Sequence, residues 1–471
     1  MPGLGLKRVH RLGFAPHWFS EILNAVRADI TPDVQPTTSA ATVIVAASDS
    51  KDTTRADFVV PAGSTSAQTV INQAISALPD VGGKVVLLEG TYIVDGSIVL
   101  PSNVHLEVSQ GATIKLKDAF SGYAPIITNA DWVNGNTNIT ITGPGTIDGN
   151  KENVLGYPNN ISLVKVNNSC IKDLVVKDPR ADAINLYNSS NNSIINNRCL
   201  NSRGFAGIYL EDLCNENVII GNICYQNGYG IYLRSNCTQN IIAMNQCLGN
   251  LASGISLEGI DTNYNIITGN ICKGNYTGIM IEASQANITT GNVCQQNGSY
   301  GIYLVFSRYE NVIGNLVLEN SQATNTAYDN IYLYGCSYTV VQNNICRAGN
   351  LVNKPRYGIN IISGAGNVVQ NNDLYSAGVT SNLNNAGTDT IIQNNRGYST
   401  EFLKVTGASV AIGTGGAYGS ATAFTPVSGI IRGFDVNINI GGTFAADETV
   451  TVKIETVFSD GTTAFVEKSF T

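Results

Sequence analysis

The chain has 471 residues, of which 13% are charged, and its formal net charge is -8. An acidic chain without a basic run argues against a nucleic-acid partner, and no apolar run reaches the roughly 18 residues of a membrane span. Charges within residues 1–11 interrupt any apolar core of a secretion signal, so export by the general route is not expected.

Residues 1–55 are predicted to be an attachment segment and linker. Residues 16–26 have the pattern of a short amphipathic helix, followed by a Pro/Thr/Ser/Ala linker from Thr31 to about Ser50. The apolar face of this helix consists of Phe19, Ile22, Leu23 and Val26. An isolated helix of this length is marginal in water, so the segment is expected to dock on a partner or on its own copies; a disordered tail is the alternative.

A second helix is predicted over residues 64–78, with a Ser/Thr cap and an apolar face. That face consists of Val70, Ile71, Ala74, Ile75 and Leu78. Strand-like runs follow at residues 83–92 and 98–104. A helix directly before the first coil of a solenoid would cover its open apolar end.

A repeat then dominates the chain from Ile184 to Ile359. Each unit contains Gly-Ile-Tyr-Leu or a near copy, a polar link and, in most units, Asn-x-Cys. The isoleucines recur at intervals of 23 to 29 residues, at Ile184, Ile208, Ile231, Ile255, Ile279, Ile302, Ile331 and Ile359. A period of about 20–29 residues with short β-type runs is typical of a solenoid. Three strands fit in each unit, for example 207–211, 217–220 and 223–225, which predicts an all-β, single-stranded parallel β-helix of about 10–12 coils.

Cysteine and asparagine recur at fixed positions of this repeat. The cysteines in phase are Cys199, Cys224, Cys247, Cys272, Cys294 and Cys346. Residues in phase stack about 4.8 Å apart, so these thiols are expected to be small buried core residues. With three histidines and no CxxC pair, neither a metal site nor a cofactor is expected.

The asparagines in phase are Asn197, Asn222, Asn245, Asn270, Asn292, Asn315, Asn344, Asn372 and Asn395. They are expected at a sharp turn, because asparagine tolerates the left-handed conformation and stacked amides can hydrogen-bond along the column.

The segment that precedes the repeat resembles the start of pectate-lyase-like right-handed parallel β-helix proteins, the group that includes phage tailspikes. The resemblance covers roughly residues 57–395, so the capped β-helix is assigned to 56–398. It implies a homotrimer that degrades a bacterial surface polysaccharide, attached to a phage tail or baseplate through its N-terminal segment. The expected location is therefore the virion tail, acting extracellularly at the host surface.

The catalytic motifs of related families are incomplete in this chain. The aspartate cluster of pectate lyases and the Gly-His-Gly of polygalacturonases are not present. Asp178-Pro179-Arg180 resembles the Asp-Pro-His of alginate epimerases with the histidine missing.

Residues 399–471 are predicted to form a small antiparallel β domain. Runs of period two occur at 429–440, 448–455 and 463–470, separated by Gly/Asp turns. The domain could cap the solenoid, join subunits or bind sugar.

Two outward columns are predicted beside the inward isoleucines and leucines of the first strand. The first is Asn185, Tyr209, Tyr232, Ser256, Met280, Tyr303, Tyr332 and Asn360, and the second is Tyr187, Glu211, Arg234, Glu258, Glu282, Val305, Tyr334 and Ile362. Tyrosine rings beside charged groups suit a sugar-binding groove, although tyrosine also favours strands for packing reasons alone.

The carboxylates supply the candidate catalytic groups. Glu258 and Glu282 are one coil apart, about 4.8 Å, and Glu211 is two coils from Glu258, about 9.6 Å. Retaining glycosidases place two carboxyl groups about 5–5.5 Å apart and inverting ones about 6.5–9.5 Å. Repulsion between neighbouring glutamates would raise one pKa and create a proton donor. Alternatively, Arg234 would simply hold Glu211 and Glu258 ionised.

The sequence thus predicts a glycoside hydrolase with Glu258 and Glu282 as acid and nucleophile or base, Glu211 as competitor, and Asp212 and Asp182 as further candidates. Arg234 and the tyrosines 209, 232, 303 and 332 would bind substrate. The alternatives are a lyase or epimerase that acts on uronic acids, with a tyrosine base, and a non-catalytic receptor-binding adhesin.

Overall fold

The computed structural model describes residues 41–398, except residue 203, and the backbone of residues 450–457 and 463–470. The helix expected over residues 16–26 and the strand expected over 429–440 lie outside the described residues. The chain divides into two compact units between Thr400 and Glu401.

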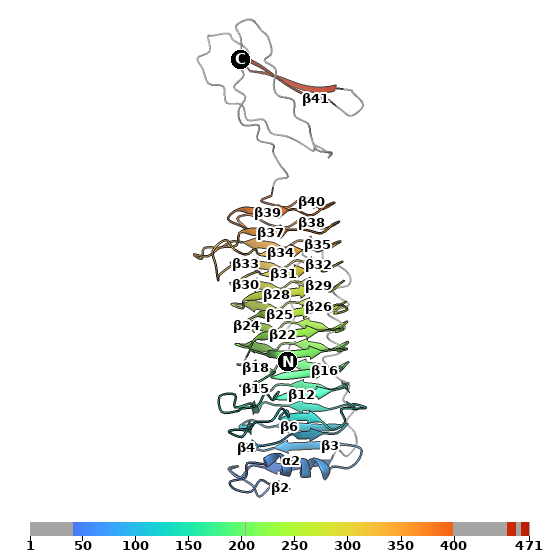
Figure 1. The fold of residues 1–471 in the computed structure, drawn as a ribbon, viewed down its shortest axis with the longest axis vertical. Coiled ribbons are helices and arrows are strands. Elements are labelled where there is room, and N and C mark those ends of the chain that lie inside the picture. The colour runs from blue at the N-terminus through green and yellow to red at the C-terminus, as the bar shows by residue number, and fades with distance from the viewer. Residues whose placement is uncertain (1–40, 203, 399–449, 458–462, 471) are drawn as a thin grey trace, which may run out of the picture. The chain divides into compact units, whose positions relative to one another are not determined.

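Three parallel sheets, here called A, B and C, form a solenoid from residue 41 to residue 398 (Figure 1). Each regular coil contributes one strand to sheet C, then one to A and one to B, as expected from the repeat. The solenoid has about 13 turns, more than the 10–12 expected, because the stretch before Ile184 also forms stacked coils although it lacks the Gly-Ile-Tyr-Leu phrase.

The 15 strands of sheet A are β1 (Ala41–Ala46), β2 (Phe58–Val59), β3 (Gly83–Leu87), β6 (Val104–Val108), β10 (Thr140–Thr142), β14 (Cys170–Lys172), β17 (Ser193–Ile195), β20 (Val218–Ile220), β23 (Ile241–Ala243), β26 (Ile266–Thr268), β29 (Ile288–Thr290), β32 (Asn311–Ile313), β35 (Val340–Gln342), β38 (Val368–Gln370) and β40 (Ile391–Gln393).

The 11 strands of sheet B are β4 (Gly90–Val94), β7 (Ala112–Leu116), β11 (Thr146–Asp148), β15 (Val175–Lys177), β18 (Arg198–Leu200), β21 (Ile223–Tyr225), β24 (Gln246–Leu248), β27 (Ile271–Lys273), β30 (Val293–Gln295), β33 (Leu316–Leu318) and β36 (Ile345–Arg347).

The 12 strands of sheet C are β5 (Ile98–Leu100), β8 (Ile127–Asn129), β12 (Ile161–Val164), β16 (Ile184–Tyr187), β19 (Ala206–Glu211), β22 (Tyr229–Arg234), β25 (Ser253–Glu258), β28 (Thr277–Glu282), β31 (Ile302–Val305), β34 (Ile331–Tyr334), β37 (Tyr357–Ile361) and β39 (Ser381–Asn385). A small parallel pair, β9 (Asn136–Thr137) and β13 (Val166–Asn167), lies outside these sheets.

The helix expected over residues 64–78 is α2 (Ala67–Ser76), which packs against β1, β4 and β5. Its buried residues are Ala67, Ile71, Ala74 and Ile75, which confirms three of the five residues of the expected face. Val70 and Leu78 are only partly buried against the core, and Leu78 lies beyond the end of the helix. Ser66 is the N-cap residue, but its side chain makes no capping hydrogen bond, in contrast to the expected Ser/Thr cap. None of the helices in the described part of the chain has the length and apolar character needed to cross a bilayer.

The expected linker does not extend to Ser50, because Ala41–Ala46 forms β1 within sheet A. This strand pairs in parallel with β3 through residues Ala41 to Val45. Val45 and Ala46 are fully buried. The apolar run that begins at Ala41 therefore belongs to the solenoid and not to the linker.

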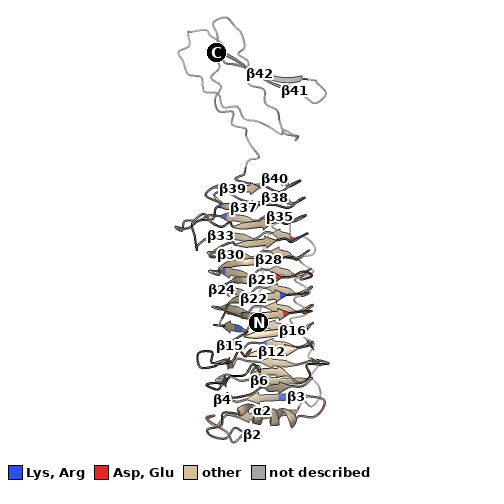
Figure 2. Cartoon of the chain, in the orientation of Figure 1, with Lys and Arg blue, Asp and Glu red and all other residues tan. Residues whose placement is uncertain are grey.

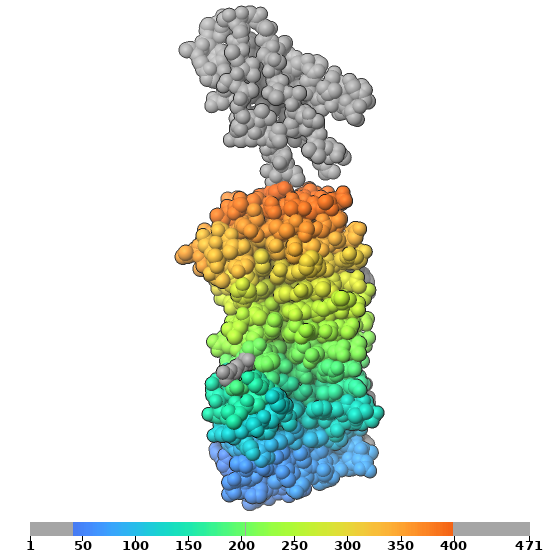
Figure 3. Space-filling model, in the orientation of Figure 1, coloured from blue at the N-terminus to red at the C-terminus, as the bar shows by residue number. Residues whose placement is uncertain are grey.

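The interior is filled by the residues that the repeat placed inward. The anchor isoleucines from Ile184 to Ile359 are all fully buried. The six in-phase cysteines occupy one column of sheet B, as expected, and are also fully buried. All ten cysteines of the chain are free thiols. The stacked coils form successive bands on the surface of the solenoid (Figure 3).

An asparagine ladder runs along each of the three corners of the solenoid. In the predicted ladder, the side-chain Nδ2 of Asn222 donates to Oδ1 of Asn245 at 3.0 Å, and Asn245 repeats this contact with Asn270. The left-handed conformation expected for these residues was wrong: it belongs to the residue before each of them, such as Gly221 and Met244. The amide ladder is therefore the reason for asparagine at this corner.

The C-terminal unit is described only by its last two strands. β41 (Val450–Val457) and β42 (Thr463–Phe470) pair antiparallel, with Val450 opposite Phe470. The period-two runs at the end of the sequence predicted this hairpin.

Candidate functional site

The outward face of sheet C carries the two predicted columns in register. Tyr209 pairs with Tyr232 across β19 and β22, and the pairing Glu211, Arg234, Glu258, Glu282 continues from β19 to β28. Figure 2 shows acidic and basic segments close together at the ends of the strands near β22 and β25, in a solenoid that is mostly uncharged. The sequence therefore predicted which side chains are neighbours on this face.

Glu258 is the most firmly held of the candidate carboxylates. The Tyr232 hydroxyl donates to its Oε2 at 2.6 Å, and the Ser256 hydroxyl donates to its Oε1 at 2.9 Å. Both donors lie on sheet C, one on the preceding strand and one on the same strand as Glu258. Two hydroxyl donors on two oxygens fix the orientation of the carboxylate in advance of any ligand.

Three tyrosines form a stack beside Glu258, on the side of the earlier coils. The rings of Tyr209 and Tyr232 are 5.0 Å apart at an interplanar angle of 10°, and those of Tyr229 and Tyr232 are 4.6 Å apart at 14°. The Tyr209–Tyr232 spacing is close to the strand spacing of about 4.8 Å, so these ring faces point along the solenoid. Burial raises the pKa of Tyr209 and of Tyr232, which keeps both as neutral phenols.

A second group of tyrosines faces the first from the later coils. Tyr300 stacks on Tyr332 at an interplanar angle of 21° and lies tilted by 31° against Tyr303, with ring centroids 4.6 Å apart in each case. Tyr328 lies across Tyr300 at 5.1 Å, and its hydroxyl contacts that of Tyr276 at 3.1 Å. Burial also raises the pKa of Tyr300, Tyr303 and Tyr332.

Between the two groups lies a hollow of about 280 Å³, here called the slot. Its walls are formed by Tyr229, Tyr276, Tyr300, Tyr303 and Tyr328. Its floor is formed by Ala252, Ser253, Thr277, Met280 and Ser299, with Glu258 at the edge. The slot exists because the coils of β25 and β28 carry small or flexible side chains where the coils on either side carry tyrosine.

Tyr229 and Tyr300 were not predicted at the site, since strict alternation places them inward, two residues before an inward isoleucine. The strand bends at the intervening glycine, which faces inward instead. A Cβ on Gly230 would lie 3.0 Å from both the Asn250 Nδ2 and the Cys247 Cβ atoms. The recurrent glycine before the isoleucine was the available signal for this bend. Tyr276 and Tyr328 come from connections outside the repeated phrase, and no sequence signal indicated their role.

The other charged candidates lie at the ends of neighbouring strands. Glu282 is directly opposite Glu258, and Glu211 is directly opposite Arg234. The guanidinium of Arg234 is exposed, and within residues 41–398 it forms no ion pair with Glu211 or Glu258. Its charge is therefore available to a ligand.

Asp182 and Asp212 are placed differently from the glutamates. Asp182 is 7% exposed, and its Oδ1 accepts a hydrogen bond from the Ala206 backbone N–H at 2.8 Å. Burial, with a further contribution from the charge of Glu211, raises the pKa of Asp182 to about 7. Asp212 follows β19, and its Oδ2 accepts a 3.4 Å contact from the Tyr187 hydroxyl. Neither carboxylate lines the slot.

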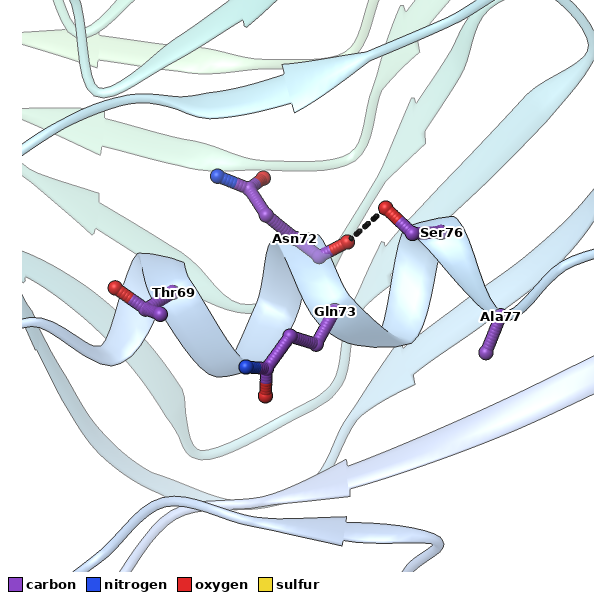
Figure 4. Close-up of a pocket in the computed structure, with 5 residues that line it drawn as sticks. All are labelled: Thr69, Asn72, Gln73, Ser76 and Ala77. Atoms are coloured by element: carbon purple, nitrogen blue, oxygen red, sulfur yellow. Dashed lines mark hydrogen bonds between the residues drawn. The ribbon is translucent and has the colours of Figure 1, made fainter.

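A second depression, of about 530 Å³, lies on α2 (Figure 4). It is lined by Thr69, Asn72, Gln73, Ser76 and Ala77. None of these side chains is a titratable group or an aromatic ring, so the slot remains the better candidate site. Within the part of the chain that the structure describes, no group of three or more His, Cys, Asp and Glu side chains is placed to hold a metal ion.

The family model for the right handed beta helix region matches residues 157–316 and 249–397, together a little over half of the chain. No curated protein shows a significant sequence match to the chain.

Among solved structures, the A-modules of the mannuronan C-5 epimerases AlgE6 and AlgE4 from Azotobacter vinelandii are similar to this chain. Their TM-scores are 0.60 and 0.58 at 16% and 18% sequence identity, and each comparison covers 72% of this chain and 97% of the module. The Dettilon tailspike protein has a TM-score of 0.56 at 18% identity, covering 71% of this chain and 66% of the tailspike chain. At these identities the similarity shows the shared fold alone.

Proposed function

This chain belongs to the right handed beta helix family, and from that premise we propose that it binds a polysaccharide along sheet C and hydrolyses a glycosidic bond there. The observation that carries the proposal is Glu258, held by Tyr232 and Ser256 at the edge of the tyrosine-walled slot. Aromatic faces with hydroxyl groups are suited to sugar rings. The epimerases of similar fold are named for a polysaccharide, mannuronan.

The proposed catalytic pair is Glu258 and Glu282. Their strands are neighbours, about 4.8 Å apart, which is close to the carboxyl spacing of about 5–5.5 Å in retaining enzymes. Glu258, already oriented, acts as nucleophile or base, and Glu282 acts as the acid. Arg234 orients the substrate or stabilises developing charge.

Glu211 is the competing partner of Glu258. It lies two strands away, about 9.6 Å, at the upper limit of the inverting range of about 6.5–9.5 Å. Asp182 and Asp212 are further candidates: the pKa of Asp182, raised to about 7 by burial, keeps its carboxyl group protonated close to neutral pH.

The second candidate function is a lyase or epimerase that acts on uronic acids. The observation that favours it is the charge of Arg234 beside Tyr209, which could neutralise a substrate carboxylate while the tyrosine acts as base. Against it, burial raises the pKa of Tyr209 overall, which makes the phenolate base more costly to form.

The biological setting is proposed from the resemblance to tailspikes. The chain would form a homotrimer in a virion tail, attach to the tail or baseplate through residues 1–55, and meet a bacterial surface polysaccharide outside the cell. Residues 399–471 would trimerise, cap the solenoid or bind carbohydrate. Light scattering coupled to size-exclusion chromatography tests the trimer directly.

The decisive experiment is product analysis after incubation with purified bacterial surface polysaccharides. Hydrolysis predicts new reducing ends without unsaturated, ultraviolet-absorbing sugars. Glu258→Gln and Glu282→Gln should each lower the rate by about 10²–10⁴-fold, whereas Glu216→Gln, an exposed carboxylate on the sheet A side, should not. Unsaturated products would establish the lyase, and full activity in both glutamate variants would refute the assigned pair. Binding without any new product in the wild type would support an adhesin.

A further inference from the structure

The slot has the dimensions of a subsite for one sugar ring. Its volume is about 280 Å³, just below the roughly 300–1,000 Å³ of pockets that hold drug-sized ligands. The tyrosine-bearing strands β22 and β31 are three strand spacings apart, about 14 Å. The space between these walls suits a single sugar ring of the polysaccharide and is too small for several.

The lining of the slot is selective in charge. It contains no lysine or arginine, and its single ionisable carboxyl group is that of Glu258. Both oxygens of Glu258 accept hydrogen bonds from hydroxyl groups. The wall tyrosines remain neutral, because burial raises the pKa of Tyr229, Tyr300 and Tyr303.

Arg356, the cation near the slot residue Tyr300, is already paired. Arg356 donates to Asp329 from Nε at 3.2 Å and from Nη2 at 2.9 Å, and Asp329 is fully buried. This pair fixes the wall, since the Arg356 backbone N–H donates to the Tyr328 carbonyl oxygen at 2.7 Å. The ion pair thus helps to position the backbone of Tyr328, and the charge of Arg356 is already compensated by Asp329.

We infer that the slot binds one uncharged pyranose ring between its tyrosine walls, so that the polysaccharide presents a neutral sugar at this site. A uronate carboxylate placed there would meet the charge of Glu258, and the slot lining itself supplies no cation, since Arg234 lies on the neighbouring strand and does not line the slot. Hydroxyls, in contrast, can bond to Ser253, Thr277 and Ser299. This inference deepens the proposed function and rests on it.

The test offers each uronic-acid-containing polysaccharide in two forms, native and carboxyl-reduced, so that linkage and stereochemistry are matched. Binding is measured by calorimetry with the full chain carrying Glu282→Gln to slow cleavage. The carboxyl-reduced form should bind at least about tenfold more tightly. Met280→Arg, which places a cation on the slot floor, should reverse this preference. The control is Ile271→Arg, which places the same charge at an exposed position of β27 in sheet B, away from the slot. It should leave the preference for the carboxyl-reduced form unchanged.

Three results would overturn the inference. Tighter binding of the native uronic form by the parent protein would contradict the neutral subsite while leaving a polysaccharide-processing function intact. Undiminished binding of the reduced form by a Thr277→Trp variant, whose indole would fill the slot, would place the ring elsewhere. If no polysaccharide in either form is bound or cleaved, the proposed function fails, and the subsite fails with it.

Discussion

Glu310 interrupts an asparagine ladder and provides a quantitative test of the packing argument. The ladder runs through Asn240 and Asn265 to Asn287, whose backbone N–H and Nδ2 donate to the Glu310 carboxyl group at 3.0 Å and 3.2 Å. Glu310 is 1% exposed, and burial raises its pKa from 4.5 to about 8 in spite of these two bonds. A neutral isostere should therefore fit this site better than the carboxylate.

The magnitude follows from linkage between protonation and folding. One pKa unit corresponds to about 1.36 kcal/mol, so a rise from 4.5 to about 8 corresponds to at most about 5 kcal/mol. Because the pKa of Glu310 is higher in the folded state, the carboxyl group is protonated in both the folded and the unfolded state below about pH 4.5. The loss of folding stability caused by burying the carboxylate is therefore absent at that pH. Stability then falls as the pH rises, and the full cost is reached above about pH 8. The adjacent Cys336 does not titrate in this window, because burial raises its pKa to about 12.

Glu310→Gln removes this pH dependence. Urea unfolding followed by circular dichroism between about pH 4 and pH 9 should show nearly equal stability at the acid end and a growing advantage for the variant toward the alkaline end. Glu216→Gln, at an exposed position, serves as the control. A difference between wild type and Glu310→Gln that stays constant over the whole range would refute the reasoning.

Two further predictions concern the site and the scaffold. Tyr232→Phe keeps the stacked ring but removes the hydroxyl that donates to Glu258 at 2.6 Å. Because a hydrogen bond to a charged group is lost, kcat should fall roughly tenfold or more. An unchanged kcat would show that this hydrogen bond does not contribute to catalysis. Asn245→Ala removes four side-chain hydrogen bonds of the buried ladder. Urea unfolding should show a loss of about 3 kcal/mol or more, whereas Asn350→Ala, at an exposed position, should have little effect; equal losses would count against the ladder.

Much of the fold was predictable because a solenoid turns sequence period into spatial neighbourhood. Once the anchors such as Ile208 and Ile231 were aligned, the inward and outward sides of each strand followed, and the register of sheet C confirms them. The number of coils before Ile184 was underestimated, because the strands there alternate apolar and polar residues without the Gly-Ile-Tyr-Leu repeat. The turn asparagines were identified correctly, but the left-handed residue was misplaced by one position.

The site was predictable only in part. The neighbourhood of Glu211, Arg234, Glu258 and Glu282 was visible in the repeat, whereas the slot was not. Tyr229 joins the site because the strand bends at Gly230, where a side chain would collide with the Asn250 amide and the Cys247 thiol side chain.

The sequence by itself determined the period, and therefore the core columns and the order of charges on sheet C, because hydrogen bonding between parallel coils forces equivalent residues to stack. Only the tertiary structure decided which of those residues form a cavity. That outcome depends on side chains from different coils and connections, such as Tyr276 and Tyr328, meeting across a floor of small residues. It also depends on burial, which gives Asp182 and Glu310 their raised pKa values although neither position is marked in the repeat.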